Sequence, residues 1–274
     1  SDVSGSSFHQ NAGGVIVTPQ TNPPRSTQTA IVPFSIFVGK GVVKNVSGAP
    51  GGAISGLSRM EIEAIFNRQA NAKDWKAFGF GTVTDGAPGT LEATSPIHLC
   101  GRQGGSGTLA AFDETIMINA THTSGSIPDV EVELLPGSSD VLNCIANNRR
   151  SIGYMDADQL VKFQAGGSSD GLGYVIRIDG GLAKDGALTD PKRDLKCGKY
   201  AYWAGWRLNR RAAGVDGTDI DALSQAFVDN AGAQATIAII PTGAFWASDE
   251  EMFVSKNSDR GPLVWKAGDH TACR

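Results

Sequence analysis

Residues 101–112, GRQGGSGTLAAF, place one arginine, four glycines and two hydroxyl residues just ahead of a helical pattern. A helix begins with unpaired backbone N–H groups and a partial positive charge, and glycines let the backbone close on a bound anion. Ser106 and Thr108 offer hydroxyl donors, while the planar guanidinium of Arg102 suits a tetrahedral oxyanion. The spacing predicts an anion-binding cradle, although a glycine-rich connection capped by Ser106, with Arg102 in solvent, accounts for the same residues.

Other chemistries fit the sequence less well. The segment lacks the Gly-Lys-Ser/Thr of a nucleotide-binding P-loop and the glycine spacing of a dinucleotide fingerprint. His98, Ser106 and Asp113 would form a hydrolase triad, but Ser106 lacks the G-x-S-x-G elbow and His98 falls inside a strand pattern. The four histidines lack metal-ligand spacing; they are His9, His98, His122 and His270. We therefore predict no catalytic residue, no cofactor and no metal site.

Composition narrows the range of partners. Charged residues make up 19% of the 274 residues, and the formal net charge is −4. Nucleic acids and anionic membranes attract basic patches, and the sequence has no run of Lys or Arg that would form one. No stretch reaches the roughly 20 apolar residues of a membrane helix. The composition indicates a loop-rich globular protein that binds no nucleic acid and holds any anion by local geometry.

The number and spacing of the cysteines bear on whether the protein resides in an oxidising compartment. The four cysteines are too far apart for a CxxC metal site and allow two disulfides in three connectivities; they are Cys100, Cys144, Cys197 and Cys273. An even number of cysteines favours an oxidising compartment, whereas buried free thiols are the alternative. We expect a secreted or periplasmic protein.

Apolar runs and helical patterns alternate along the chain. A capping box of Ser58 and Glu61 predicts the start of a helix that buries Ile62, Ile65 and Phe66. The other patterns predict helices at residues 109–116, 138–147 and 218–231, and strands at residues 13–19, 30–43, 95–102, 149–157, 174–180, 199–208 and 235–243. Such alternation predicts an α/β architecture with largely parallel sheets.

The cradle also carries a family resemblance. Arg102, residues 105–108 and Phe112 resemble the R-x-x-G-S-G-T…F motif of phosphate-binding proteins, the exported receptors of high-affinity phosphate ABC transporters. In the same order, residues 54–75 resemble the family's Leu-Ser…Ile-Phe…Trp segment, and residues 138–157 resemble its helix followed by an Ile-Gly-Tyr strand. The similarity extends over most of the chain, and the segments are fairly specific when taken together.

The resemblance implies an α/β fold of the type II periplasmic-binding-protein class, with two lobes joined by crossing strands and an oxyanion bound in the cleft between them. It implies a first lobe beginning in residues 1–93, a second lobe at residues 94–178, and a return to the first lobe with a C-terminal segment at residues 179–274. The implied protein is periplasmic or extracellular, binds inorganic phosphate or a similar oxyanion without catalysis, and works with an ABC permease.

Residue by residue, the resemblance makes Arg102 the partner of the anion, while Ser106, Gly107 and Thr108 donate hydrogen bonds from side chain and backbone. In the family, the Asp of a Ser-Asp pair accepts the proton of hydrogen phosphate, and the pair of Ser1 and Asp2 matches it here. A carboxylate beside the anion favours a ligand that still carries a proton over a fully ionised one such as sulfate.

One departure leaves two functions open. The family places a strand, an anion loop, a helix and a second strand before the Ser-Asp pair, with which this sequence starts. The first lobe is therefore expected to be incomplete, with its edge covered by its own cleaved N-terminal segment, by neighbouring copies, or by residues of a longer sequence. The intact cradle favours an oxyanion receptor. The incomplete lobe favours a structural or self-assembling extracellular protein with a vestigial pocket.

Overall fold

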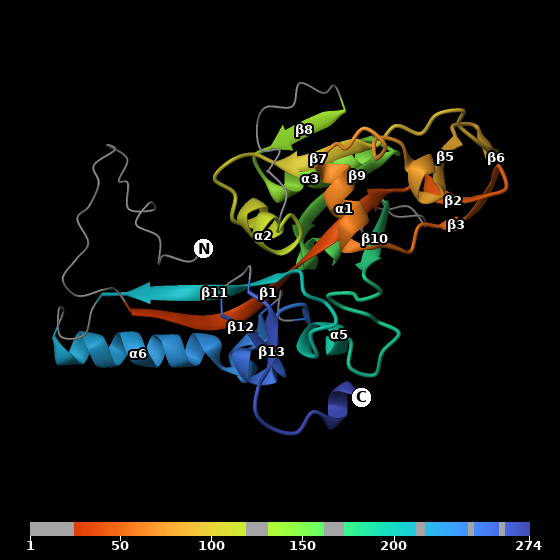
Figure 1. Ribbon diagram of the computed structural model, residues 1–274. Coiled ribbons are helices and arrows are strands. Elements are labelled where there is room, and N and C mark those ends of the chain that lie inside the picture. The colour runs from red at the N-terminus through yellow and green to blue at the C-terminus, as the bar shows by residue number, and fades with distance from the viewer. Residues whose placement is uncertain (1–24, 119–130, 162–172, 212–216, 241–243, 258–260) are drawn as a thin grey trace, which may run out of the picture.

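One long strand organises the molecule. The structure is a computed structural model that describes residues 25–118, 131–161, 173–211, 217–240, 244–257 and 261–274. Along its first half, β1 (Arg25–Gly39) pairs antiparallel with β11 (Trp203–Arg210). Its second half enters a sheet between β9 (Ser151–Asp156) and β10 (Gly173–Ile178), as Figure 1 shows. In this way the two halves of β1 pair with different sets of strands, one half with β11 and the other with β9 and β10.

The central sheet combines both strand directions. Its order is β4-β10-β1-β9-β7-β8, with β11 beside β1, and the strands not yet introduced are β4 (Gly56–Leu57), β7 (His98–Arg102) and β8 (Val132–Leu135). β7 runs parallel to β8 and β9, but β1 runs antiparallel to β9, β10 and β11. The prediction of largely parallel sheets is wrong, since β1 runs against all of its neighbours among the described strands and the two smaller sheets are antiparallel throughout.

The remaining elements extend or cover this sheet. An antiparallel sheet of order β3-β2-β5-β6 follows β1 in the chain, and β12 and β13 form a separate pair. These strands are β2 (Val42–Val46), β3 (Ala49–Ala53), β5 (Phe80–Thr84), β6 (Ala87–Leu91), β12 (Val254–Lys256) and β13 (Leu263–Trp265). The helices are α1 (Arg59–Phe66), α2 (Gly107–Thr115), α3 (Ser138–Asn147), α5 (Arg193–Lys196), α6 (Thr218–Gly232) and α7 (Gln234–Ile239). None of these helices in the described part of the chain has the length and apolar character of a membrane span.

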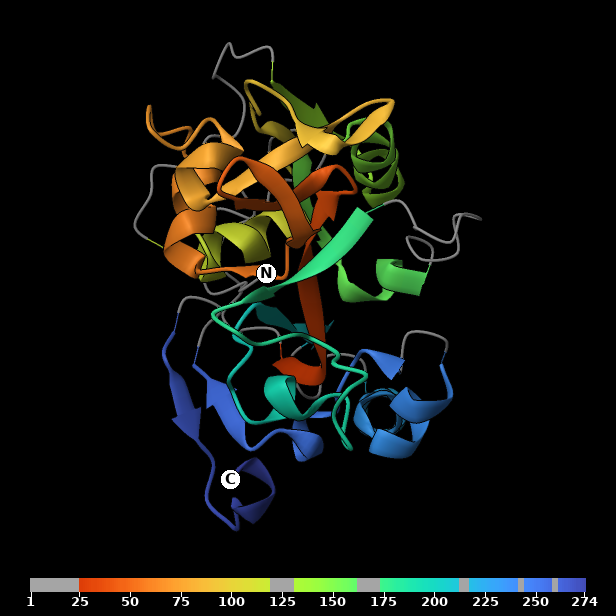
Figure 2. The ribbon, with the colours of Figure 1, turned by 90° about the vertical axis from the view of Figure 1, so that its right-hand side faces the viewer.

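Two lobes are visible in Figures 1 and 2. One contains α1, α2 and α3 around the central sheet, and the other contains β11, α5, α6 and the β12-β13 pair. A single buried cluster reaches from Ile62 and Phe112 in the first lobe to Tyr202 and Met252 in the second. The rings of Phe112 and Tyr202 meet edge to face with centroids 5.8 Å apart. The predicted two-lobed α/β class is confirmed, while the predicted boundaries at residues 93 and 178 stay predictions.

Local sequence signals predicted most of the elements correctly. Ser58 caps α1 as expected: its hydroxyl oxygen accepts the Glu61 N–H at 3.2 Å, and its own N–H donates to the Glu61 carboxylate at 2.7 Å. The buried residues of α1 are Ile62, Ile65 and Phe66. Helices α2, α3 and α6 and strands β7, β9 and β10 also lie where they were predicted. The strand predicted at residues 13–19 lies outside the described residues.

The strand predicted at residues 235–243 is wrong over its described part, where the chain forms α7. In this helix Ile237 is buried, while the Ile239 side chain is 82% exposed. A short run of apolar residues fits a helix as well as a strand. Because α7 follows α6 after one extended residue, Ala233, and packs against it, the chain continues as a helix.

Two disulfides pair the cysteines. Cys100 in β7 is bonded to Cys144 in α3, and Cys197, just after α5, is bonded to Cys273. This pairing is one of the three connectivities that the sequence allowed. The first bond ties a strand of the central sheet to the helix that covers it, and the second ties the C-terminal segment to the second lobe.

We expect Ser58→Ala to lower the free energy of unfolding by about 1 kcal/mol, because the first turn of α1 loses its hydroxyl acceptor. Urea unfolding followed by circular dichroism measures this change. Ser55→Ala, at a neighbouring exposed serine, is the matched control and should change the same free energy by less than ~0.5 kcal/mol. Equal stability of the two variants would contradict the role assigned to the cap.

Candidate functional site

The chain from β7 into α2 forms the predicted cradle. β7 ends at Arg102, and Gly105 then takes a left-handed conformation, with φ +87°, that residues with a side chain rarely adopt. Ser106 caps α2, since its hydroxyl oxygen accepts the Leu109 N–H at 3.3 Å. The first N–H groups of α2 therefore lie close to the carboxyl end of β7.

The start of α2 is open on the side of its glycines. A Cβ built on Gly104 or Gly107 would meet no heavy atom within 4 Å. The backbone there is accessible to a small ligand, and it carries the partial positive charge of a helix N-terminus.

The guanidinium of Arg102 lies between α2 and α3. Nη1 donates to Ser138 Oγ at 3.0 Å and to Thr108 Oγ1 at 3.4 Å, and Nη2 donates to the carbonyl oxygen of Pro136 at 2.9 Å. Its Nε is buried and has no hydrogen-bond partner among the described residues. These contacts argue against the alternative in which Arg102 is solvated.

Ser138 and Asp156 join the cradle, and the sequence analysis missed both. Ser138 is the first residue of α3, and Asp156 is the last residue of β9. The Asp156 carboxylate accepts the Ser138 hydroxyl at 3.3 Å and the Thr108 hydroxyl at 3.5 Å, so the two hydroxyls connect it to the guanidinium of Arg102. Their position in the predicted fold could have identified them, because ligands of α/β sheets bind beyond the carboxyl ends of the strands, where these residues lie.

The electrostatics of Asp156 differ from those of an exposed aspartate. Burial raises the pKa of its carboxyl group above the usual range, and the charge of Asp158 raises it further. The hydrogen bond from Ser138 and the charge of Arg102 lower this pKa without cancelling the effect of burial. Two helix N-termini and a guanidinium thus favour an anion at the site, whereas the carboxyl group opposes one unless it is protonated.

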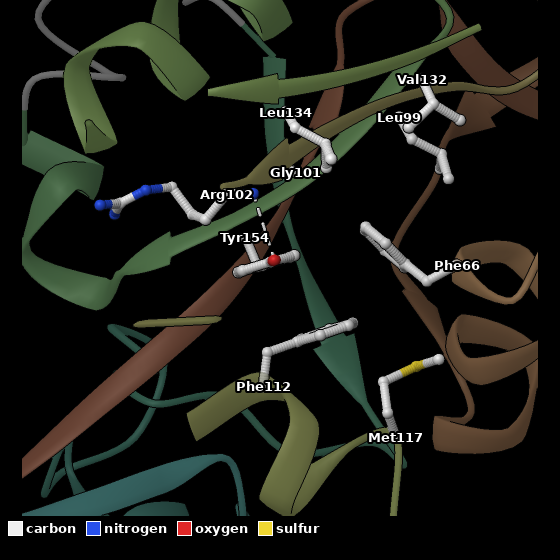
Figure 3. A pocket seen from close by; sticks show the side chains of 9 residues that line it. All are labelled: Phe66, Leu99, Gly101, Arg102, Phe112, Met117, Val132, Leu134 and Tyr154. Atoms are coloured by element: carbon white, nitrogen blue, oxygen red, sulfur yellow. Dashed lines mark hydrogen bonds between the residues drawn. The ribbon is translucent and has the colours of Figure 1, made fainter. Parts of the chain in front are cut away.

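Aromatic rings support the strands that carry these groups. Tyr154 and Phe112 stack with centroids 4.1 Å apart and planes 4° from parallel, and the Tyr154 hydroxyl oxygen accepts the backbone N–H of Arg102 at 3.2 Å. Burial raises the pKa of Tyr154, so its phenol stays neutral. Figure 3 shows these rings around a small apolar pocket, from which the Arg102 side chain points away. The Tyr154 hydroxyl thus links β9 to the end of β7, and the Phe112 ring packs α2 against β9, while the guanidinium of Arg102 points away from the rings.

The structure brings the predicted residues of the cradle together, since Arg102, Ser106, Gly107 and Thr108 all lie where β7 passes into α2. The predicted proton acceptor, the pair of Ser1 and Asp2, lies outside the described residues.

The contacts of His98 argue against the hydrolase triad. Its Nδ1 lies 3.0 Å from a carboxylate oxygen of Glu131, and its Nε2 lies 2.9 Å from one of Glu133. Both ring nitrogens are therefore engaged with carboxylates, and the Ser106 hydroxyl is engaged in capping α2.

Comparison with known proteins identifies the fold. No protein-family model and no curated protein matches the chain. It is similar to a Clostridium perfringens protein, assigned as a phosphate ABC transporter substrate-binding protein and solved with bound phosphate, at a TM-score of 0.52 and 16% identity over 82% of this chain and 72% of that chain. It is also similar to a Planctomyces limnophilus protein, assigned as a phosphate-binding protein, at a TM-score of 0.50 and 12% identity over 84% of this chain and 69% of that chain. The chain therefore has the two-lobed fold of phosphate ABC transporter substrate-binding proteins.

Proposed function

We propose that the chain binds a tetrahedral oxyanion, phosphate before others, and that it does so without catalysis. The observation that carries this proposal is the convergence of the Arg102 guanidinium with the N-termini of α2 and α3 at the carboxyl end of β7. N–H groups at helix starts and guanidinium forks are the donors that tetrahedral oxyanions prefer in proteins.

In this proposal the anion lies in the cleft between the lobes. The Arg102 guanidinium pairs with it, the hydroxyls of Ser106 and Thr108 donate to it, and so do the backbone N–H groups at the start of α2, that of Gly107 included. In the same proposal the pair of Ser1 and Asp2 accepts the proton of hydrogen phosphate.

Partners and compartment follow from the same proposal. The fold is that of receptors that deliver phosphate to transporters, which supports an ABC permease as the protein partner. The two disulfides support export to the periplasm or to the extracellular medium, where such bonds persist.

A second candidate function, self-assembly, is supported by the surface of α6. Ile220, Leu223 and Phe227 are 56%, 72% and 64% exposed, and their spacing places them in one row along the helix. The buried residue of α6, Val228, lies on a different side. A row of exposed large apolar side chains is typical of a protein contact.

We expect Arg102→Ala to weaken phosphate binding by roughly 10- to 150-fold, the equivalent of one hydrogen bond to a charged group. Arg102→Lys keeps the positive charge but lacks the planar guanidinium, so its affinity for phosphate should lie between those of wild type and Arg102→Ala. Ser138→Ala should have a smaller effect, since it removes a neutral hydroxyl. Isothermal titration calorimetry on protein freed of bound ligand measures each affinity.

The control for these variants is Lys40→Ala, because Lys40 is exposed in the turn after β1. Lys192→Ala would be an unsuitable control, because it would break structural contacts. The Lys192 ammonium group donates to the Trp246 carbonyl oxygen at 2.7 Å and lies 3.3 Å from the Glu251 carboxylate. Wild-type protein that gives no heat with phosphate, arsenate or sulfate would overturn the proposal.

We expect the folded protein to lose stability as pH rises through the raised pKa of Asp156. Between the usual carboxyl range and that pKa, the folded state binds the proton more strongly than the unfolded state, so the free energy of unfolding falls with rising pH. Asp156→Asn should abolish this fall and be more stable than wild type at neutral pH. Urea unfolding across acidic to neutral pH measures it. Asp158→Asn keeps the Asp156 carboxyl but removes a charge that raises its pKa, so this variant should show a smaller fall than wild type.

If α6 mediates assembly, sedimentation velocity should show species larger than the monomer at micromolar concentration. Phe227→Glu should then weaken self-association by about tenfold or more, because a charge would be buried in the contact. Ala222→Glu introduces the same charge at an exposed position of α6 away from the apolar row, and it serves as the control. A compact monomer at all concentrations excludes the assembly function.

A further inference from the structure

The fold brings one histidine and two cysteines together behind the anion cradle. His98 and Cys100 lie two residues apart in β7, so their side chains project from the same face of the sheet. α3 covers this face and brings Cys144 to the same place. One candidate ligand atom from each of the three residues lies within 4.8 Å of the others, although their spacing in the sequence predicted no metal site.

Two carboxylates flank the imidazole of this cluster. Glu131 lies 3.0 Å from Nδ1 of His98, and Glu133 lies 2.9 Å from its Nε2. A histidine that binds a metal through one ring nitrogen usually donates its other N–H to a carboxylate. Whichever nitrogen of His98 turns to a metal, the other nitrogen therefore keeps a carboxylate partner that orients the ring.

An open groove leads from solvent to this cluster. It has a volume of about 370 Å³, and its lining includes Cys144, Glu133, Asp140 and Asn143. The Cys144 side chain forms part of the wall, whereas Cys100 is fully buried behind it. The carboxylates of Glu133 and Asp140 make the groove attractive to a cation. Both a reductant and a metal ion can approach the cysteine pair by this route.

We propose that His98, Cys100 and Cys144 form a Zn²⁺ site when the disulfide between the two cysteines is reduced. A phosphine or dithiol reductant supplies two electrons, and two protons complete the two thiols while the reductant is oxidised. Zn²⁺ then binds both sulfurs as thiolates, with release of the two thiol protons, and takes one ring nitrogen of His98. Glu133 or water completes the four ligands.

The dimensions of the cluster suit this metal. Tetrahedral zinc with Zn–S distances of about 2.3 Å holds two thiolates roughly 3.8 Å apart. The candidate ligand atoms already lie within 4.8 Å of one another, and the ring nitrogen of His98 that binds the metal exchanges its carboxylate hydrogen bond for the ion. In the oxidised protein both sulfurs are held in the disulfide, which makes the site dependent on reduction.

The test uses the full chain with Cys197→Ser and Cys273→Ser, so that Cys100 and Cys144 are the remaining cysteines. The protein is reduced with a phosphine and titrated with Co²⁺, whose visible absorption reports tetrahedral thiolate ligands. We expect binding of one Co²⁺ per chain, displacement by Zn²⁺, and no such absorption from the oxidised protein. His98→Gln should weaken binding at least about tenfold, while the control His270→Gln should leave it unchanged.

Circular dichroism of the same samples shows whether Co²⁺ is bound by the folded protein or by the thiols of an unfolded chain. If the reduced His98→Gln variant binds Co²⁺ as tightly as the reduced protein that keeps His98, the proposal is overturned, whether or not the chain is folded. Reduced protein that binds no Co²⁺ overturns it too, and equal binding by the oxidised protein overturns its dependence on reduction. Zn²⁺ should also raise the melting temperature of the reduced protein but not that of its Cys144→Ser variant.

Discussion

The continuity of β1 is the constraint on which the rest of the structure depends. One half of the strand is hydrogen-bonded to β11, and the other half is hydrogen-bonded on both sides, to β9 and β10. β9 in turn pairs with β7, and β7 pairs with β8. The carboxyl ends of β7 and β9 carry Arg102 and Asp156, and the chain after β8 leads to Ser138. Because β1 passes through both lobes, it positions this group of residues relative to the second lobe.

The candidate anion site is held together by hydroxyl groups that act in both directions. Ser138 and Thr108 each accept a hydrogen bond from Arg102 and donate one to Asp156. The Asp156 carboxylate therefore uses the same donors that a bound oxyanion would use. An oxyanion has to compete with this carboxylate for the hydroxyls, and protonation of Asp156 lowers that competition. The raised pKa of Asp156 extends the pH range over which this happens.

The bond between Cys100 and Cys144 connects the two halves of the same site. Cys100 lies in β7, which ends at Arg102, and Cys144 lies in α3, which begins at Ser138. This covalent link holds the strand and the helix together and limits the freedom of the unfolded chain. A zinc ion bound to the reduced pair would join the same two elements. Reduction of this pair, or zinc bound to it as proposed, would therefore act on the two elements that carry Arg102 and Ser138.

The sequence by itself determined the features that depend on residues a few positions apart. The capping box of Ser58 and the turn from Arg102 into α2 could be predicted because their hydrogen bonds are made within one or two turns of chain. Only the tertiary structure decided the direction of β1, the helical state of α7, the disulfide pairing, and the meeting of Ser138 and Asp156 with Arg102. These depend on strand order and lobe packing, which join segments far apart in the sequence and leave no local pattern.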